Sequence, residues 1–287
     1  MGAPTILAED VYREELARAG AQDGRVVCVE ALPTRVRHPF ETAHPDRFFQ
    51  LGSVESATLT MVEGLVTAGF RVFVCGVGLE AGVRAARLPR LSTSCLAAGA
   101  SVVVPDTQAD PADLLRTPRV QIAVPSGVRE IRGVVRGAVR SGRPHHIRLG
   151  SAAPVDVSAD WAGADDGDIP SVVWGADRAR GGADTQVCLV SVGEHGARLA
   201  VAVQERFAGA AHARLVYLDD SHLTAASGEL ARRCNRFVVL GGHQGPYGVR
   251  SRLSRLMPGC DVRAFPVCAE AASDVDRVLS LLEGLRS

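Results

Sequence analysis

Three short stretches of the sequence contain candidate functional residues, and the first of them is a glycine-rich turn. Residues 76–81 read Gly-Val-Gly-Leu-Glu-Ala after an apolar run, which matches the GxGxxA turn that holds a dinucleotide. Such a site also needs a carboxylate about 20 residues later to bind the ribose hydroxyls. The first carboxylate after this turn is Asp106. It lies beyond the end of the next apolar run, too far along the chain for this role. A nicotinamide- or flavin-dependent dehydrogenase is therefore a rival interpretation only.

The second stretch is another glycine-rich turn, at residues 241–248, which read Gly-Gly-His-Gln-Gly-Pro-Tyr-Gly. Backbone amides that precede a helix can hold an anion, and His243 could face such a ligand. The turn lacks the Gly-Lys-Ser/Thr ending of a nucleotide-binding loop, and its glycines could equally serve the backbone alone. Both roles of this turn, and of His243, stay open.

The third stretch, residues 44–56, reads His-Pro-Asp-Arg-Phe-Phe-Gln-Leu-Gly-Ser-Val-Glu-Ser and places Glu55 at the start of a helical pattern. With Ser53 as the expected N-cap, a carboxylate in the first turn is favoured by the helix dipole and needs no catalytic reason. The chain has no GxSxG, HExxH, EF-hand or paired CxxC motif. Neither a serine hydrolase nor a metal centre is therefore predicted from motifs.

The elements that must position these residues alternate between strands and helices. In the first half, apolar strand-like runs alternate with helical patterns such as those at 54–67 and 128–139. This alternation predicts a mostly parallel sheet covered on both faces. Residues 154–184 are rich in turn formers and read as a linker, with a hairpin suggested near 172–174, and four strand–helix units follow. We expect an α/β protein with two doubly wound domains, at 1–153 and 185–287.

Composition narrows the class of partner. The 32 basic and 32 acidic residues cancel, so no global field would draw the chain to nucleic acid or to an anionic membrane. Acidic residues near the N-terminus contradict a signal or transit peptide, and no apolar stretch approaches the ~20 residues that cross a bilayer. The seven cysteines lack CxxC spacing and are expected to be buried reduced thiols. These features predict a cytoplasmic protein that acts on small molecules.

The stretch from residue 44 to 74 resembles the C-terminal halves of transketolases and 1-deoxyxylulose-phosphate synthases. Their pattern reads FPDRFF-x-VGIAEQ, followed by a glycine-bearing helix and a strand. The similarity continues in order along the chain from about residue 5 to 270. Residues 120–125 resemble MTVIVP, 146–150 resemble VYIRLG, and 236–243 resemble AIVTVEEH. The resemblance implies a pyrimidine-binding domain at 1–153 and a transketolase C-terminal domain at 185–287.

The same resemblance assigns a role to Glu55. The matching acidic residue in that family bonds N1′ of the aminopyrimidine of thiamine diphosphate and so drives formation of the reactive ylid. A carboxylate suits this task because it must share a proton with a ring nitrogen in a dry interface. The resemblance also places Gly52, Val77 and Glu80 beside the cofactor.

Half of the implied cofactor site is absent from this sequence. The family holds the diphosphate and Mg²⁺ through a GDG motif and a later Asn, but Asp166-Gly167-Asp168 does not match and the one asparagine is Asn235. The resemblance therefore implies a separate N-terminal-half subunit that supplies diphosphate and metal binding. An α₂β₂ heterotetramer is the family arrangement.

Departures from the family pattern bear on the substrate. Val77 and Glu80 stand where the family has aromatic residues that pack on the aminopyrimidine, so the pyrimidine pocket is altered. The family's THQ histidine has no counterpart near residues 106–108, and Ser151 replaces an arginine that binds sugar phosphate. The loss of these two phosphate ligands indicates that at least one substrate is not an ordinary sugar phosphate. The candidates for substrate contact are His38, Arg84 and His243.

The expected function is transfer of a two-carbon ketol or acyl unit to an aldehyde-type acceptor, a carboligation in secondary metabolism. One alternative keeps the fold and makes the chain a β-type subunit of a 2-oxoacid dehydrogenase E1, which passes its acyl group to lipoyl. Another alternative is a non-catalytic subunit that stabilises its partner, since the pyrimidine contacts are altered.

Overall fold

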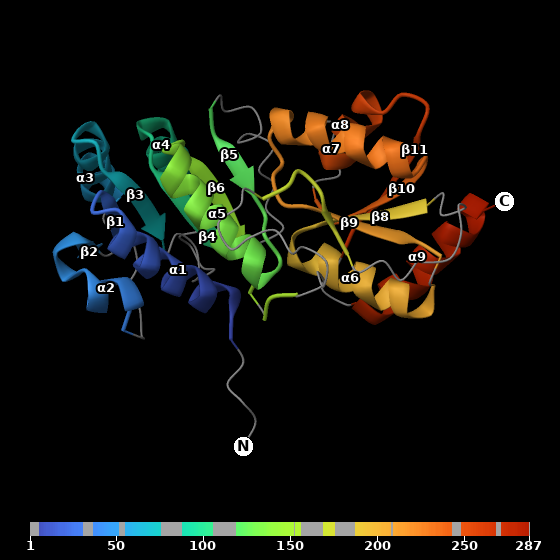
Figure 1. The fold of residues 1–287 in the computed structure, drawn as a ribbon, viewed down its shortest axis with the longest axis horizontal. Coiled ribbons are helices and arrows are strands. Elements are labelled where there is room, and N and C mark those ends of the chain that lie inside the picture. The colour runs from blue at the N-terminus through green and yellow to red at the C-terminus, as the bar shows by residue number, and fades with distance from the viewer. Residues whose placement is uncertain are drawn as a thin grey trace, which may run out of the picture. The chain divides into compact units, whose positions relative to one another are not determined.

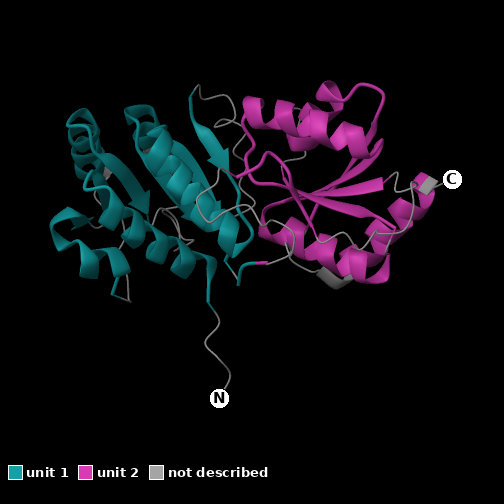
Figure 2. Ribbon diagram, viewed as in Figure 1, with its two compact units in different colours: residues 1–107, 117–154 teal, residues 108–116, 155–287 magenta. Residues whose placement is uncertain are grey.

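The structure is a computed structural model. The residues that it describes are 6–30, 37–51, 55–75, 88–105, 119–151, 153–155, 169–175, 187–207, 209–242, 248–267 and 271–286. The chain divides into two compact units (Figure 2). The first comprises residues 1–107 and 117–154, and the second comprises residues 108–116 and 155–287.

The first unit is built on a six-stranded sheet in the order β2-β1-β3-β4-β6-β5 (Figure 1). Its strands are β1 (Val26–Glu30), β2 (Phe48–Gln50), β3 (Arg71–Cys75), β4 (Ser101–Pro105), β5 (Gln121–Ala123) and β6 (His145–Leu149). Every neighbouring pair is parallel. The carboxyl ends of all six strands therefore meet at one edge of the sheet, which we call the carboxyl edge.

Helices cover this sheet in two groups. They are α1 (Ala8–Gln22), α2 (Pro39–Ala43), α3 (Glu55–Thr67), α4 (Leu88–Ala98) and α5 (Val128–Ser141), and a short 3-10 turn spans Pro45–Arg47. Helix α1 packs against α2 and α5, whereas α3 packs against α4. Helix α5 begins where the Glu130 carboxylate accepts hydrogen bonds from the backbone of Ser126 (2.7 Å) and Gly127 (3.1 Å), and it ends at Gly142 in a left-handed conformation.

Burial explains why these runs form a parallel sheet. All five residues of β1 are buried, and so are all five of β6. A strand covered on both faces needs apolar residues at successive positions, and this is the pattern of the run at 26–29. The resulting core leaves buried polar groups at the strand ends, where they need partners.

The second unit has a five-stranded sheet in the order β11-β10-β8-β9-β7. Its strands are β7 (Val173–Trp174), β8 (Val187–Val192), β9 (Ala211–Leu215), β10 (Arg236–Leu240) and β11 (Asp261–Phe265). Its helices are α6 (Gly193–Arg206), α7 (Asp220–Arg233), α8 (Val249–Leu256) and α9 (Ala271–Arg286). Figure 1 shows α7 and α8 on one face of this sheet and α6 and α9 on the other.

The observed fold confirms the predicted α/β class with mostly parallel sheets. The helices expected at 54–67 and 128–139 are α3 and α5. Where a hairpin was suggested near 172–174, the structure has the two-residue strand β7, which pairs antiparallel with β9 at the edge of the sheet. A strand that short has too few residues to show a period in sequence.

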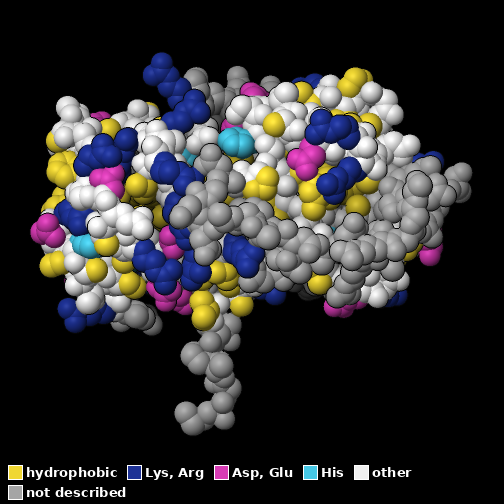
Figure 3. All heavy atoms as spheres, in the orientation of Figure 1, with side chains coloured by type: hydrophobic (Ala, Val, Ile, Leu, Met, Phe, Trp, Pro, Cys, Tyr) yellow, Lys and Arg dark blue, Asp and Glu magenta, His cyan; other side chains and the backbone are white. Residues whose placement is uncertain are grey.

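The surface carries charges of both signs. Figure 3 shows basic and acidic side chains interspersed over the visible face. A buried charge also joins two helices, because Arg136 of α5 donates to the Glu15 carboxylate of α1 at 2.6 Å. Among the described helices, none has the length and apolar character needed to cross a bilayer.

Candidate functional site at the carboxyl edge of the first sheet

Helix α3 starts at Glu55, close to the carboxyl edge. Strand β2 ends at Gln50, so the Glu55 backbone lies within about 18 Å of it even if the intervening chain is fully extended. The chain leaving β2 is tied to the end of β1, because the Leu51 amide donates to the Glu30 carbonyl at 3.1 Å. In parallel α/β sheets, ligands bind outside the carboxyl ends of the strands. The chain therefore runs from the edge of the sheet where a ligand is expected into the start of α3.

Several of the sequence-predicted site residues lie outside the described residues. This applies to the Glu55 side chain and to Gly52, Val77, Glu80, Arg84 and His243. Their side-chain roles remain predictions.

His38 is the one predicted substrate residue that the structure places. It is fully buried at the N-cap of α2, where its Nδ1 accepts a hydrogen bond from the Phe40 amide at 3.0 Å. Its Nε2 lies 3.4 Å from a carboxylate oxygen of Glu30. Burial, with a smaller contribution from the Arg13 charge, lowers the pKa of His38 to about 4, so its ring is neutral near pH 7.

Glu30 is a buried carboxylate that sequence reasoning missed. It is the last residue of β1, only 1% exposed, and its backbone neighbours across the sheet are Gln50 on β2 and Cys75 on β3. Burial raises the pKa of Glu30 to about 7, and the Arg13 charge opposes part of this rise. One feature of the sequence could have revealed Glu30: it is an acidic residue that directly follows four apolar ones at the end of an expected strand.

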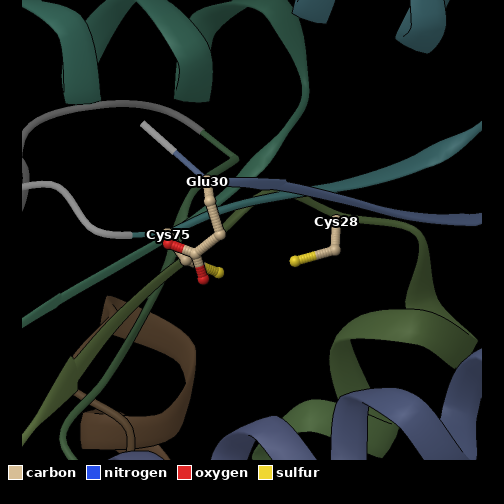
Figure 4. A group of neighbouring side chains, drawn as sticks. All are labelled: Cys28, Glu30 and Cys75. Atoms are coloured by element: carbon tan, nitrogen blue, oxygen red, sulfur yellow. The ribbon is translucent and has the colours of Figure 1, made fainter. Parts of the chain in front are cut away.

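Two cysteines and a tyrosine surround Glu30. Figure 4 shows the Glu30 carboxylate beside the Cys75 thiol, with the Cys28 thiol directed toward both. One ligand atom from each of these three residues lies within 4.8 Å of the other two. The Tyr12 hydroxyl lies 2.8 Å from Cys75 Sγ. Burial raises the pKa of Tyr12 and of Cys28 well above their ordinary values, so both are protonated.

The second unit contains a Ser–His pair that does not form a catalytic triad among the described residues. Ser191 Oγ lies 2.8 Å from His212 Nε2, and both side chains are buried. A triad would need a carboxylate on His212 Nδ1, but that atom has no hydrogen-bond partner within the described ranges. Burial lowers the pKa of His212 to about 3, so the pair is a neutral structural contact.

No protein-family model matches the chain. A stretch of 71 residues, 24% of the chain, is 37% identical to 1-deoxy-D-xylulose-5-phosphate synthase of Thermomicrobium roseum (strain ATCC 27502 / DSM 5159 / P-2), of which it covers 11%. The similarity in sequence is thus confined to a small part of that enzyme.

Similarity in fold extends over nearly the whole chain. A split-gene transketolase described as an inactive β4 tetramer matches with a TM-score of 0.74 and 20% identity, over 97% of this chain and 99% of that one. A transketolase point mutant from Pichia stipitis matches with a TM-score of 0.65 and 14% identity, over 98% of this chain and 44% of that one. The chain therefore spans less than half of that transketolase.

By fold, the protein is an α/β protein similar to transketolase, with two units that each contain a mostly parallel sheet. The similarity in fold to the split-gene protein covers both chains nearly from end to end. The predicted resemblance to the C-terminal half of transketolase is confirmed by this fold.

Proposed function

We propose that the chain is one subunit of a split thiamine-diphosphate-dependent enzyme that transfers a two-carbon ketol or acyl unit to an aldehyde-type acceptor. Residues 1–153 act as its pyrimidine-binding domain and residues 185–287 as its C-terminal domain. The observation that carries this proposal is the match to the split-gene transketolase, which covers 97% of this chain and 99% of the other. Secondary metabolism is the proposed setting, because the residues that bind sugar phosphate in the family are replaced.

Glu55 is the proposed catalytic residue. It begins α3 near the carboxyl edge, which fits the position of a group that meets a ligand outside the strand ends. Thiamine diphosphate, when bound, supplies a nucleophilic carbon and an electron sink. The task of Glu55 is to share a proton with N1′ of the aminopyrimidine, with Gly52, Val77 and Glu80 beside the ring. On the substrate side we propose Arg84 and His243. His38, the third residue expected to contact substrate, is fully buried against Glu30 in the described part of the chain, so it is left out of this proposal.

A partner subunit would complete the site. The chain lacks the GDG motif and later Asn that hold the diphosphate and Mg²⁺ in the resembled family. The similar split-gene chain is described as an inactive β4 tetramer. By analogy, we propose that this chain by itself assembles with its own copies and lacks activity. Activity would appear with an N-terminal-half subunit, in an α₂β₂ assembly.

The test is reconstitution with a matched pair of variants on α3. The chain is purified together with a subunit that carries the GDG and Asn residues, and ketol transfer from ketose or 2-oxo acid donors to aldehydes is measured. Glu55→Gln should leave assembly intact and lower turnover by roughly 10²- to 10⁴-fold, the range for loss of a positioned acid–base group. Glu63→Gln, an exposed change on the same helix, should leave turnover unchanged.

The outcomes separate the alternatives. Full activity in the Glu55→Gln variant would contradict the proposed role of this residue. Product that forms only with a lipoyl acceptor would favour the 2-oxoacid dehydrogenase E1 alternative. Stable assembly with no turnover on any donor would favour a subunit that only stabilises its partner. Stabilisation of the isolated chain by a nicotinamide cofactor, without any effect of thiamine diphosphate, would favour a dehydrogenase.

A further inference from the structure

The topology of the first sheet brings Cys28, Glu30 and Cys75 together. Cys28 and Glu30 are two residues apart on β1, so their side chains leave the same face of the sheet. Cys75 is the Cα partner of Glu30 on the neighbouring strand β3. Two thiols and one carboxylate therefore converge at the carboxyl edge, and Figure 4 shows them directed toward a common point.

The convergence leaves a buried polar atom without a partner. Glu30 Oε2 has no hydrogen bond in the part of the chain that the structure describes, although the Glu30 side chain is 1% exposed. A buried carboxylate oxygen without a partner costs free energy, since it has lost its water. A cation bound between this oxygen and the two thiols would remove that cost.

Each anionic group has a neighbour suited to orient it. The Tyr12 hydroxyl lies 2.8 Å from Cys75 Sγ and can donate to a thiolate. His38 Nδ1 accepts from the Phe40 amide, so in the neutral ring the proton sits on Nε2. Nε2 faces the other Glu30 oxygen at 3.4 Å without a hydrogen bond among the described residues, so a small shift of either side chain would be needed for it to donate. With Nδ1 already engaged and Nε2 protonated, His38 is not counted as a ligand. Metal ligands in proteins commonly have such supporting hydrogen bonds.

From this arrangement we propose that Cys28, Glu30 and Cys75 bind a thiophilic divalent cation, which we assign as Zn²⁺. Ligand atoms at the usual Zn–S and Zn–O lengths lie about 3.3–3.8 Å apart in a tetrahedron. The observed limit of 4.8 Å therefore requires shifts of only about 1 Å. Two thiolates select Zn²⁺ over Mg²⁺ or Ca²⁺, which prefer oxygen ligands. Water would fill the fourth position.

A disulfide fits the same cysteines less well. Cys28 is the Cα partner of Phe73, whereas Cys75 lies two residues further along β3. With strands about 4.8 Å apart and a rise of about 3.3 Å per residue, the two Cα atoms lie about 8 Å apart. A disulfide usually requires less than about 7 Å. Both cysteines are free thiols in the structure. The offset thus suits a cation between the thiols better than a bond between them.

The site would join three elements of the first unit. It ties β1 to β3 directly and reaches α1 through Tyr12. Binding would release protons from the thiols, so affinity should rise with pH.

The test measures zinc in the purified full-length chain, without thiamine diphosphate or a partner subunit. The chain is incubated with Zn²⁺ under reducing conditions, freed of excess metal, and analysed by inductively coupled plasma mass spectrometry. We expect about one zinc per chain. Cys28→Ser and Cys75→Ser should each lower the occupancy at least tenfold. The matched control is Cys95→Ser, which changes another fully buried free cysteine of this unit and should keep the zinc.

Cobalt gives a second measurement that does not depend on the variants being well folded. Co²⁺ in the wild-type site should produce thiolate-to-metal charge-transfer bands and the strong visible absorption of a tetrahedral ion.

A conservative variant tests the hydroxyl beside Cys75. Tyr12→Phe, which removes only this hydroxyl, should weaken metal binding by roughly 10- to 100-fold.

Three results would overturn the proposal. The first is wild-type protein that retains less than about a tenth of an equivalent of zinc and shows no cobalt charge transfer. The second is zinc that remains in the cysteine variants, or is lost equally from the Cys95→Ser control. The third is a Cys28–Cys75 disulfide, found by mass spectrometry of the non-reduced protein.

Discussion

Acid should destabilise the first unit through His146, and replacing this residue should remove that effect. His146 lies on β6, is 5% exposed, and its Nδ1 has no hydrogen-bond partner among the described residues. Burial, together with the nearby Arg148 charge, lowers the pKa of His146 to about 3. The folded unit therefore keeps this ring neutral across the whole range of ordinary working pH.

The sign of the effect follows from proton binding. In the unfolded chain His146 has a pKa near 6.5, so below that pH the unfolded state binds a proton that the folded state refuses. The stability due to the neutral ring is fully present above about pH 6.5 and is lost as the pH falls toward the folded value of about 3. At pH 5.0 the loss is RT ln(1 + 10^1.5), or about 2 kcal/mol. Any folded pKa below about 4 gives the same result.

Hydrogen exchange detected by mass spectrometry can measure this locally. Peptides that cover β4 and β6 report the free energy of opening at pH 7.5 and at pH 5.0, once intrinsic exchange rates are corrected. Between these two pH values the wild type should lose about 2 kcal/mol more than His146→Gln. The control is Ile147→Val on the same strand, which should lower stability by about 0.5–1.5 kcal/mol equally at both pH values.

Equal pH dependence in the wild type and in His146→Gln would refute this reasoning. It would mean that the folded unit accommodates the charged imidazole, through rearrangement or entry of water. A larger pH dependence in Ile147→Val than in the wild type would show instead that opening exposes other titrating groups. The comparison requires these groups to contribute equally in the wild type and in both variants.

Two further predictions concern packing and capping. In α6, a Cβ at Gly196 would overlap the Leu240 carbonyl oxygen, so Gly196→Ala should cost the second unit about 1–3 kcal/mol in thermal unfolding. Gly228→Ala on α7, where an added Cβ would have no atom within 4 Å, should stabilise that unit by up to about 1 kcal/mol. A Gly196→Ala variant more stable than Gly228→Ala would contradict the packing. Glu130→Ala removes the carboxylate that accepts from two backbone amides before α5 and should cost about 1–2 kcal/mol in chemical denaturation. A neutral result would mean that water or another side chain replaces this cap.

The sequence by itself determined the class of fold and the order of its elements. Short, β-branched apolar runs such as 26–29 indicate strands covered on both faces, because a half-exposed strand would alternate. The helical spacing from residue 54 placed the start of α3, and with it Glu55, close to the end of β2. These features depend on neighbours in the chain, so local physics reveals them.

Which side chains come into contact depends on how the strands pair. Cys28 and Cys75 lie far apart in sequence and match no metal-binding spacing, so no local pattern joined them. They converge because β3 pairs with β1 in a register that sets Cys75 opposite Glu30. The burial of Glu30 and His38 has the same origin, since α1, α2 and the strands enclose them only when the sheet is complete. Strand order and register arise from packing across the whole unit, so they cannot be read from the local pattern of a single sequence.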